Sequence, residues 1–460
     1  MASTADRIRT SLVLGAAAGT IIAVAVMSPR SAEYRAPDGT VSSTGGTDGI
    51  ELSARLATRR ILPGDQQQNV AVTITTAARP AVPSTGRPPL SLAIVIDRSG
   101  SMTGAPIENA KAAALSMLRQ LDSGDAFAVV SYSSSALTVL AMQRATEASK
   151  AAARAAIETI DASGGTCISC GLDAGAAEVA RSPVTGGLRR MLLISDGQAN
   201  AGVYDRDELA ELAARTAAGG VSISTAGVGL EFDEPTMRRL AEVGRGNYYF
   251  VEDTVALSTL FGHELATLSQ TVAADLQLRV TERPGVRVED AYGYPLTRTA
   301  GGVVVPVADL REGEVRKIVL RVRVSAARPG ALALADLALD WRWVAAGGSG
   351  TARAVASVDV VDDPAAVAAS VDPAAMRAIE QALSARAIEE AAAAYDRGGL
   401  PAAQQVLDRR SQAVRANAAY LGRGAVDALD AAQARTIDGF ARAPAAAKKA
   451  ASVTAHELAR

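Results

Sequence analysis

An acid and two hydroxyls occupy alternate positions in the stretch SLAIVIDRSGSM, directly after an apolar run. The acid is Asp97, and the hydroxyls belong to Ser99 and Ser101. Carboxylate and hydroxyl oxygens are hard ligands that suit Mg²⁺ or Mn²⁺ better than Zn²⁺ or copper. The alternation lets a tightly turned loop direct several of these oxygens at one point. A plainer alternative is that Ser101 or Thr103 caps the helix that follows.

Two further segments place oxygen-containing side chains at the start of a predicted helix or at the end of an apolar run. The stretch GGTCISCGL places Thr166 after two glycines, at the start of a predicted helix. The stretch LLISDGQAN places Asp196 at the end of another apolar run. In parallel α/β sheets, ligands bind just beyond the carboxyl ends of the strands. The three segments therefore indicate one oxygen-rich site, if the chain folds as such a sheet.

Residues 90–270 have the pattern that such a sheet requires. Apolar runs recur in SLAIVID, DAFAVVSYS, RRMLLISDG, VSISTAGVG and GNYYFVED. Helical stretches are expected between and after these runs, at 106–121, 146–160, 167–181, 205–218, 233–243 and 254–269. Strands that alternate with helices predict a mostly parallel central sheet covered on both faces. We therefore expect an α/β fold for this region.

The segments on either side of this region, 49–89 and 271–362, show two-residue alternation instead. The alternating apolar positions include Val70, Val72, Ile74, Leu320, Val322 and Val324. Alternation predicts strands with one buried face, and we expect both segments to belong to one β-sandwich that the α/β domain interrupts.

Residues 363–460 form a predicted helical region. Asp372 followed by proline is a good helix start, and Gly398-Gly399 predicts a break before a second helix. We expect a third helix after Gly424.

The chain resembles the von Willebrand factor type A family over about residues 90–270. The family's metal-ion-dependent adhesion site has the pattern D-x-S-x-S, then a threonine, then an aspartate. The matching positions here are Asp97, Ser99, Ser101, Thr166 and Asp196. The stretch GVGLEFDEPTMRRLAEVGRGNYYFVED is also similar to the end of bacterial members. The resemblance implies a Rossmann-like fold and a divalent metal, usually Mg²⁺, with Mn²⁺ or Ca²⁺ left open.

The family also implies how such a site binds a partner: an acidic side chain of the partner protein completes the coordination of the metal. The chemistry of the ligands agrees with this. Three neutral hydroxyls and two carboxylates leave Mg²⁺ with waters that an external carboxylate can replace.

Cys167 and Cys170 depart from the family pattern, in which asparagine or a small residue often stands at the first position. If this stretch is helical, their spacing of three residues brings the two Cα atoms within reach of a disulfide. We predict that the bridge forms when the protein is exported. The alternatives are two packed thiols or a redox-active pair at a helix N-terminus.

The first 30 residues are predicted to be an export signal or membrane anchor. Arg7 and Arg9 precede an uncharged stretch at 11–27, and Arg30 follows it. We favour a retained single-pass anchor over a cleaved signal, with a buried N-terminal helix as the plain alternative. Residues 31–48, rich in Ser, Gly, Thr and Pro, are interpreted as a linker.

The composition narrows the functional classes. A net charge of −2 without a basic stripe argues against a nucleic-acid-binding protein. Two cysteines and two histidines make a zinc site of Cys and His type improbable. The favoured interpretation is a non-enzymatic, extracytoplasmic protein-interaction module, tethered to the membrane, that binds a protein through a divalent metal. The alternatives are a metal-assisted hydrolase that uses the same site and a channel-like or complex-associated membrane subunit.

Overall fold

The computed structural model describes residues 45–46, 49–77, 88–196, 198–228, 233–251, 268, 270–344, 347–443, 447–448, 450–451, 454–455 and 458. The predicted signal or anchor at 1–30, most of the linker at 31–48 and almost all of the predicted helix at 254–269 lie outside these residues. The same is true of both histidines, His263 and His456.

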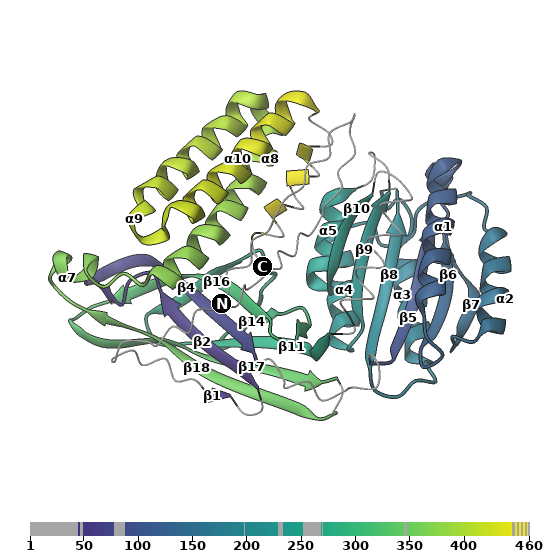
Figure 1. Cartoon of the computed structure of the whole chain (residues 1–460), viewed down its shortest axis with the longest axis horizontal. Coiled ribbons are helices and arrows are strands. Elements are labelled where there is room, and N and C mark those ends of the chain that lie inside the picture. The colour runs from purple at the N-terminus through teal and green to yellow at the C-terminus, as the bar shows by residue number, and fades with distance from the viewer. Residues whose placement is uncertain are drawn as a thin grey trace, which may run out of the picture. The chain divides into compact units, whose positions relative to one another are not determined.

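The central element of the α/β region is a sheet with the strand order β10-β9-β8-β5-β6-β7 (Figure 1). Its strands are β5 (Leu90–Asp97), β6 (Ala126–Tyr132), β7 (Ala136–Arg144), β8 (Leu188–Ser195), β9 (Ser222–Val228) and β10 (Arg245–Val251). All pair in parallel except β7, which is antiparallel to β6. Every residue of β5, β6 and β9 is buried, as continuous apolar runs in a parallel sheet predict.

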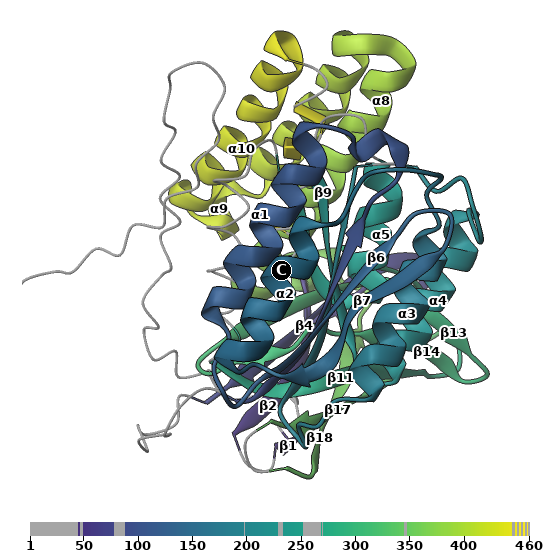
Figure 2. The same cartoon turned by 90° about the vertical axis from the view of Figure 1, so that its right-hand side faces the viewer.

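Helices cover both faces of this sheet (Figure 2). They are the short 3₁₀ turn η1 (Gly100–Met102), α1 (Ala105–Gln120), α2 (Glu147–Glu158), α3 (Ile168–Ala180), α4 (Arg206–Ala218) and α5 (Glu234–Val243). Alternate residues of β5 serve the two faces: Ile94 packs in the core with α1 and α2, and Val95 packs in the core with α3, α4 and α5. The predicted α/β fold with a mostly parallel sheet is confirmed.

A β-sandwich is built from chain segments before and after the α/β region. One sheet contains β1 (Gly45–Gly46), β3 (Arg60–Ile61), β11 (Thr271–Glu282), β13 (Thr297–Thr299), β14 (Gly302–Pro306), β15 (Leu310–Arg311), β17 (Gly330–Trp343) and β18 (Ser349–Val360). The other has the order β12-β16-β4-β2, with β2 (Ile50–Leu56), β4 (Gly64–Thr76), β12 (Val286–Tyr292) and β16 (Val315–Ala326).

The early and late segments of the sandwich are paired directly, because β4 runs antiparallel to β16 from Gly64 opposite Ala326 to Thr75 opposite Val315. Their apolar side chains share one core, in which Val72 and Ile74 lie with Leu320 and Val322. The shared sandwich predicted from the two alternating segments is therefore confirmed.

The C-terminal region is helical, with α7 (Pro364–Ala368), α8 (Pro373–Ala416), α9 (Ala418–Leu421) and α10 (Arg423–Arg442). Asp372 caps α8, since its Oδ1 accepts hydrogen bonds from the backbone N–H groups of Ala374 and Ala375. Gly398 and Gly399 have non-helical backbone angles, so α8 is interrupted at the predicted break.

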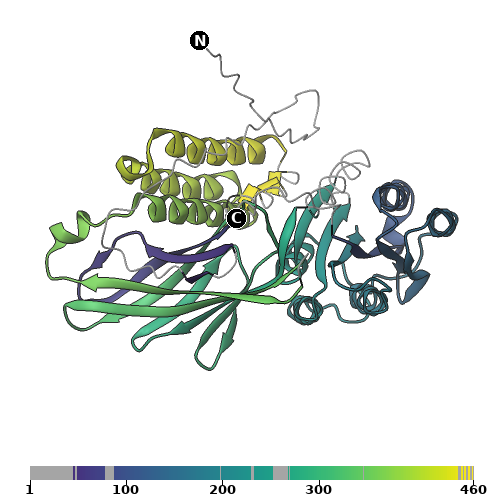
Figure 3. The ribbon, with the colours of Figure 1, turned by 60° about the horizontal axis from the view of Figure 1, so that its bottom comes forward.

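The first part of α8 packs on the four-stranded sheet of the sandwich (Figure 3), where Ile379 and Ala382 lie against Ala71 and Val319. Among the described residues, no helix combines the length and the apolar character needed to cross a membrane.

Candidate metal centre

The two acids of the candidate site are brought together by neighbouring parallel strands. Asp97 is the last residue of β5, and Asp196 directly follows β8, which pairs with β5 in parallel register. The carboxyl ends of adjacent parallel strands meet at the same edge of a sheet. Asp97 is fully buried and Asp196 is 9% exposed, so both carboxylates are largely shielded from solvent.

A chain of hydrogen bonds connects these acids through the two serines. The Ser101 hydroxyl donates to Asp196 Oδ1 at 2.9 Å, and the Ser99 and Ser101 hydroxyl oxygens lie 3.1 Å apart. The backbone N–H of Ser99 donates to Asp97 Oδ1 at 2.8 Å. Four of the five predicted site residues therefore form one connected cluster.

The alternative role of these hydroxyls as helix caps is wrong. The N-cap of α1 is Gly104, and no side chain accepts a hydrogen bond there. Ser101 faces Asp196 instead, and the Thr103 hydroxyl donates to the carbonyl of Gly100. The turn η1 thus places Ser101 within hydrogen-bond distance of Asp196 at the end of β8.

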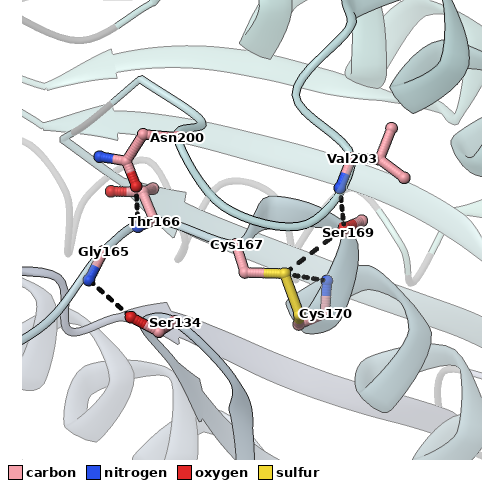
Figure 4. Close-up of a disulfide and its surroundings, with 8 residues drawn as sticks. All are labelled: Ser134, Gly165, Thr166, Cys167, Ser169, Cys170, Asn200 and Val203. Atoms are coloured by element: carbon pink, nitrogen blue, oxygen red, sulfur yellow. Dashed lines mark hydrogen bonds between the residues drawn. A yellow bond between two sulfur atoms is a disulfide. The ribbon is translucent and has the colours of Figure 1, made fainter.

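Thr166, the fifth residue, is held beside this turn by backbone contacts. The N–H of Gly100 donates to the carbonyl of Gly164 at 2.9 Å, which joins the two loops. The Thr166 N–H donates to Asn200 Oδ1 at 2.7 Å, and the Asn200 N–H donates back to the Thr166 carbonyl at 3.0 Å (Figure 4). Thr166 is 2% exposed, and within the described part of the chain its hydroxyl makes no hydrogen bond. That oxygen is free to serve as a ligand.

Three residues not predicted from the sequence support the site. The Ser195 hydroxyl donates to Asp97 Oδ2 at 2.6 Å, and the Tyr132 hydroxyl donates to the same oxygen at 3.4 Å. Asn200 is the third, through its contacts with Thr166. Ser195 and Tyr132 end the strands β8 and β6 beside candidate ligands, and that position is the signal that could have identified them, whereas Asn200 in the loop after β8 has no such signal.

The two carboxylates lie in surroundings that oppose their negative charge. Burial raises the pKa of Asp97, although hydrogen bonds from Ser195 and Ser99 partly offset it. Burial also raises the pKa of Asp196, opposed by the Ser101 hydroxyl and reinforced by the charge of Asp97. A cation between these groups would compensate both charges.

The donor set fits a hard divalent cation. It contains two carboxylates and three hydroxyls, and oxygen ligands of this kind suit Mg²⁺, Mn²⁺ or Ca²⁺. No group of three or more His, Cys, Asp or Glu side chains with metal-binding proximity occurs among the described residues. A zinc site built from nitrogen and sulfur ligands is therefore not found in that part of the chain.

Cys167 and Cys170 form a disulfide, with their Cα atoms 5.3 Å apart, so the predicted bridge is confirmed (Figure 4). Cys167 is the N-cap of α3, and its Sγ accepts a hydrogen bond from the backbone N–H of Cys170 at 3.3 Å. The bridge begins one residue after Thr166.

Comparisons with known proteins identify the domain to which the α/β region is similar. Residues 91–263 match the model of the von Willebrand factor type A domain. The uncharacterized protein YfbK of Escherichia coli K12 is 30% identical over 199 residues, which cover 43% of this chain and about a third (34%) of YfbK.

Two solved structures share the fold over most of the chain. The von Willebrand factor type A protein from Catenulispora acidiphila has a TM-score of 0.66 at 18% identity, and the alignment covers 90% of this chain and 99% of the Catenulispora chain. The ArnB paralog VWA2 from Sulfolobus acidocaldarius has a TM-score of 0.59 at 13% identity, and the alignment covers 90% of this chain and 100% of the VWA2 chain. These two structures share the fold, and the family-model match over residues 91–263 identifies the α/β region of this chain as a von Willebrand factor type A domain.

Proposed function

We propose that the cluster at the ends of β5 and β8 binds a divalent cation, with Mg²⁺ as the natural occupant. Asp97, Ser99, Ser101, Thr166 and Asp196 would hold it, and Ser195, Tyr132 and Asn200 would orient the ligands. The observation that supports the proposal most strongly is the pairing of two shielded carboxylates with hydroxyls, one of which, on Thr166, makes no hydrogen bond within the described residues.

The cation would serve to bind a partner protein. A bound divalent ion supplies a Lewis-acidic point at which an external carboxylate can replace water. Five ligands that each bind through one oxygen leave one of the six positions around Mg²⁺ to a water, which an acidic side chain can replace. The partner would therefore offer an aspartate or a glutamate.

We infer binding rather than catalysis at this site. Within the described residues, Asp97 and Asp196 accept hydrogen bonds from the Ser99 backbone N–H and from the hydroxyls of Ser101, Ser195 and Tyr132. Burial and the charge of Asp97 raise the pKa of Tyr132 well above its ordinary value, so it is a poor proton-transfer group near neutral pH. General acid–base catalysis needs a group that titrates near the working pH.

We further propose that the protein acts outside the cytoplasm, tethered by the predicted N-terminal anchor. The uncharged stretch at 11–27 between arginines supports export. The Cys167–Cys170 disulfide is consistent with an oxidising compartment, because such bonds persist there and are rare in the cytosol.

The test is capture of a partner by the immobilised chain from the envelope fraction of its own organism, in Mg²⁺ and in EDTA. We expect a protein retained in Mg²⁺ and released by EDTA, and lost with the double variant Ser99→Ala, Ser101→Ala. Ser123→Ala is the matched control, because Ser123 is exposed and precedes β6 at the other edge of the sheet. Retention that is indifferent to EDTA and to the double variant would contradict the proposal.

A further inference from the structure

The disulfide lies at the junction of the segments that position Thr166. Cys167 is fully buried, whereas Cys170 is half-buried in the first turn of α3. The N–H of Cys167 donates to the carbonyl of Ser133 at 2.7 Å, just past the end of β6. The N–H of Gly165 donates to the Ser134 hydroxyl at 2.9 Å (Figure 4). The loop that carries Thr166 is thus anchored to β6 on one side and to the disulfide turn on the other.

The loop that follows Asp196 packs directly on the sulfur of Cys167. Gly202 has a φ of +65°, and a side chain at this position would collide with Cys167 Sγ and with the Ser169 hydroxyl. Ser169 Oγ lies 3.5 Å from Cys167 Sγ and accepts a hydrogen bond from the N–H of Val203 at 3.1 Å. Space on this side of the sulfur is therefore fully occupied.

The same loop also holds Thr166. Asn200, two residues before Gly202, exchanges two hydrogen bonds with the backbone of Thr166, at 2.7 and 3.0 Å. Consequently, Cys167 Sγ and Thr166 both contact one short segment, residues 200–203. A displacement of that segment by the sulfur would move the partner that fixes Thr166.

Reduction of the bridge removes the covalent link between Cys167 and the first turn of α3. Bonded sulfurs lie about 2 Å apart, whereas two non-bonded atoms of this size settle at roughly 3.5–4 Å. Cys167 Sγ is blocked on the side of Gly202, so the sulfurs can separate through a shift of the first turn of α3, of residues 200–203, or of the half-buried Cys170 side chain.

We propose that the Cys167–Cys170 disulfide is a redox control on the cation site, in which the two cysteines act as positioning residues for Thr166. This inference rests on the proposed cation-binding function. With the bond intact, the Thr166 loop is held for cation binding. With the bond reduced, the loop loosens and the affinity for the cation falls.

A dithiol is the class of reductant that we propose, because its two thiols can react in turn and leave as its own disulfide. Its thiolate would attack Sγ of Cys170, the more exposed sulfur, and the S–S bond would break with Cys167 leaving as a thiolate that solvent protonates. The second thiolate of the reductant would then displace Cys170 from the mixed disulfide. Two electrons pass to the cystine, and the reductant leaves as its own disulfide.

The test is calorimetric titration of the full chain with Mg²⁺, oxidised and after reduction with a phosphine. Residues that orient metal ligands typically contribute about 10-fold to 100-fold in affinity, and we expect a loss in that range on reduction. Cys170→Ser cannot form the bridge, so it should bind like the reduced wild type and should not respond to reductant.

Hydrogen exchange in EDTA gives a second readout that needs no cation. Reduction should accelerate exchange at the amides of residues 165–170 and 200–203 and leave β5 unchanged. Equal Mg²⁺ affinity and equal exchange in the two redox states would overturn the inference. Failure of the oxidised chain to bind Mg²⁺ would instead overturn the proposed function, while the exchange measurement would still decide whether the bridge positions this loop.

Discussion

Replacing Asp97 with asparagine separates the charge of this side chain from its shape. Asp97 is fully buried, and its two oxygens accept from the Ser99 N–H at 2.8 Å and from the Ser195 hydroxyl at 2.6 Å. The asparagine oxygen can keep the first bond, and its NH₂ group can donate to the Ser195 hydroxyl in place of the second. The free energy of unfolding without metal should therefore change by no more than about 1 kcal/mol.

The cation should respond much more strongly than the fold. A unit charge about 4 Å from a divalent cation, at an effective dielectric constant of about 20, interacts with it by about 8 kcal/mol, so its loss should cost at least about 1,000-fold in affinity. A loss of about this size is expected for Asp97→Asn with Mg²⁺. Asp362→Asn is the matched control, because Asp362 is exposed and lies beyond β18, outside the α/β domain.

Calorimetry with Mg²⁺ and thermal melting in EDTA measure the two effects separately. An unchanged Mg²⁺ affinity in Asp97→Asn would refute the assignment of the site. A melting temperature that collapses without metal would show that Asp97 is needed mainly for folding, which would refute the argument from shape.

Two further variants test the scaffold. Glu314 is half-buried, which opposes its charge, yet Arg316 and Arg311 lower its pKa, with Arg316 Nε at 2.9 Å. Glu314→Gln leaves Arg316 buried without its carboxylate partner and should lower the free energy of unfolding by about 3–5 kcal/mol. Urea denaturation measures this loss, and an unshifted midpoint would contradict the prediction. Because the pKa of Glu314 is lowered in the folded state, its stabilising effect is present above the unfolded pKa and is lost as pH falls through the folded pKa. The stabilities of the wild type and the variant should therefore converge in acid. A difference in stability that stays constant with pH would contradict this expectation. At Gly171, an added Cβ would lie 2.7 Å from the Tyr132 ring, so Gly171→Ala should cost about 1–3 kcal/mol, and an unaltered melting temperature would speak against that packing.

The clustering of Asp97 and Asp196 could be predicted because the alternation of apolar runs and helices shows where the parallel strands end. Parallel strands β5 and β8 end at the same edge, which fixes where their last residues meet. The break in α8 at Gly398 and Gly399 could also be predicted from the sequence, since glycine is a poor helix former.

Other parts of the structure depend on contacts that a single sequence does not reveal. Strand β7 was not predicted, because its burial pattern is irregular and its pairing with β6 shifts register twice. Ser195 lies in a fully buried strand end, so its type alone did not distinguish a core residue from one that donates to Asp97. The role of Asn200 depends on the approach of its loop to Thr166, which no local pattern encodes.

The most direct measurement of the proposed cation site is an anomalous difference map from a crystal of the oxidised chain soaked in Mn²⁺. A single strong peak is expected among the oxygens of Asp97, Ser99, Ser101, Thr166 and Asp196, at about 2.0–2.2 Å from those that bind directly. The peak should vanish in Asp97→Asn. A map without a peak there, or with its only peak elsewhere on the protein, would contradict the proposed metal site.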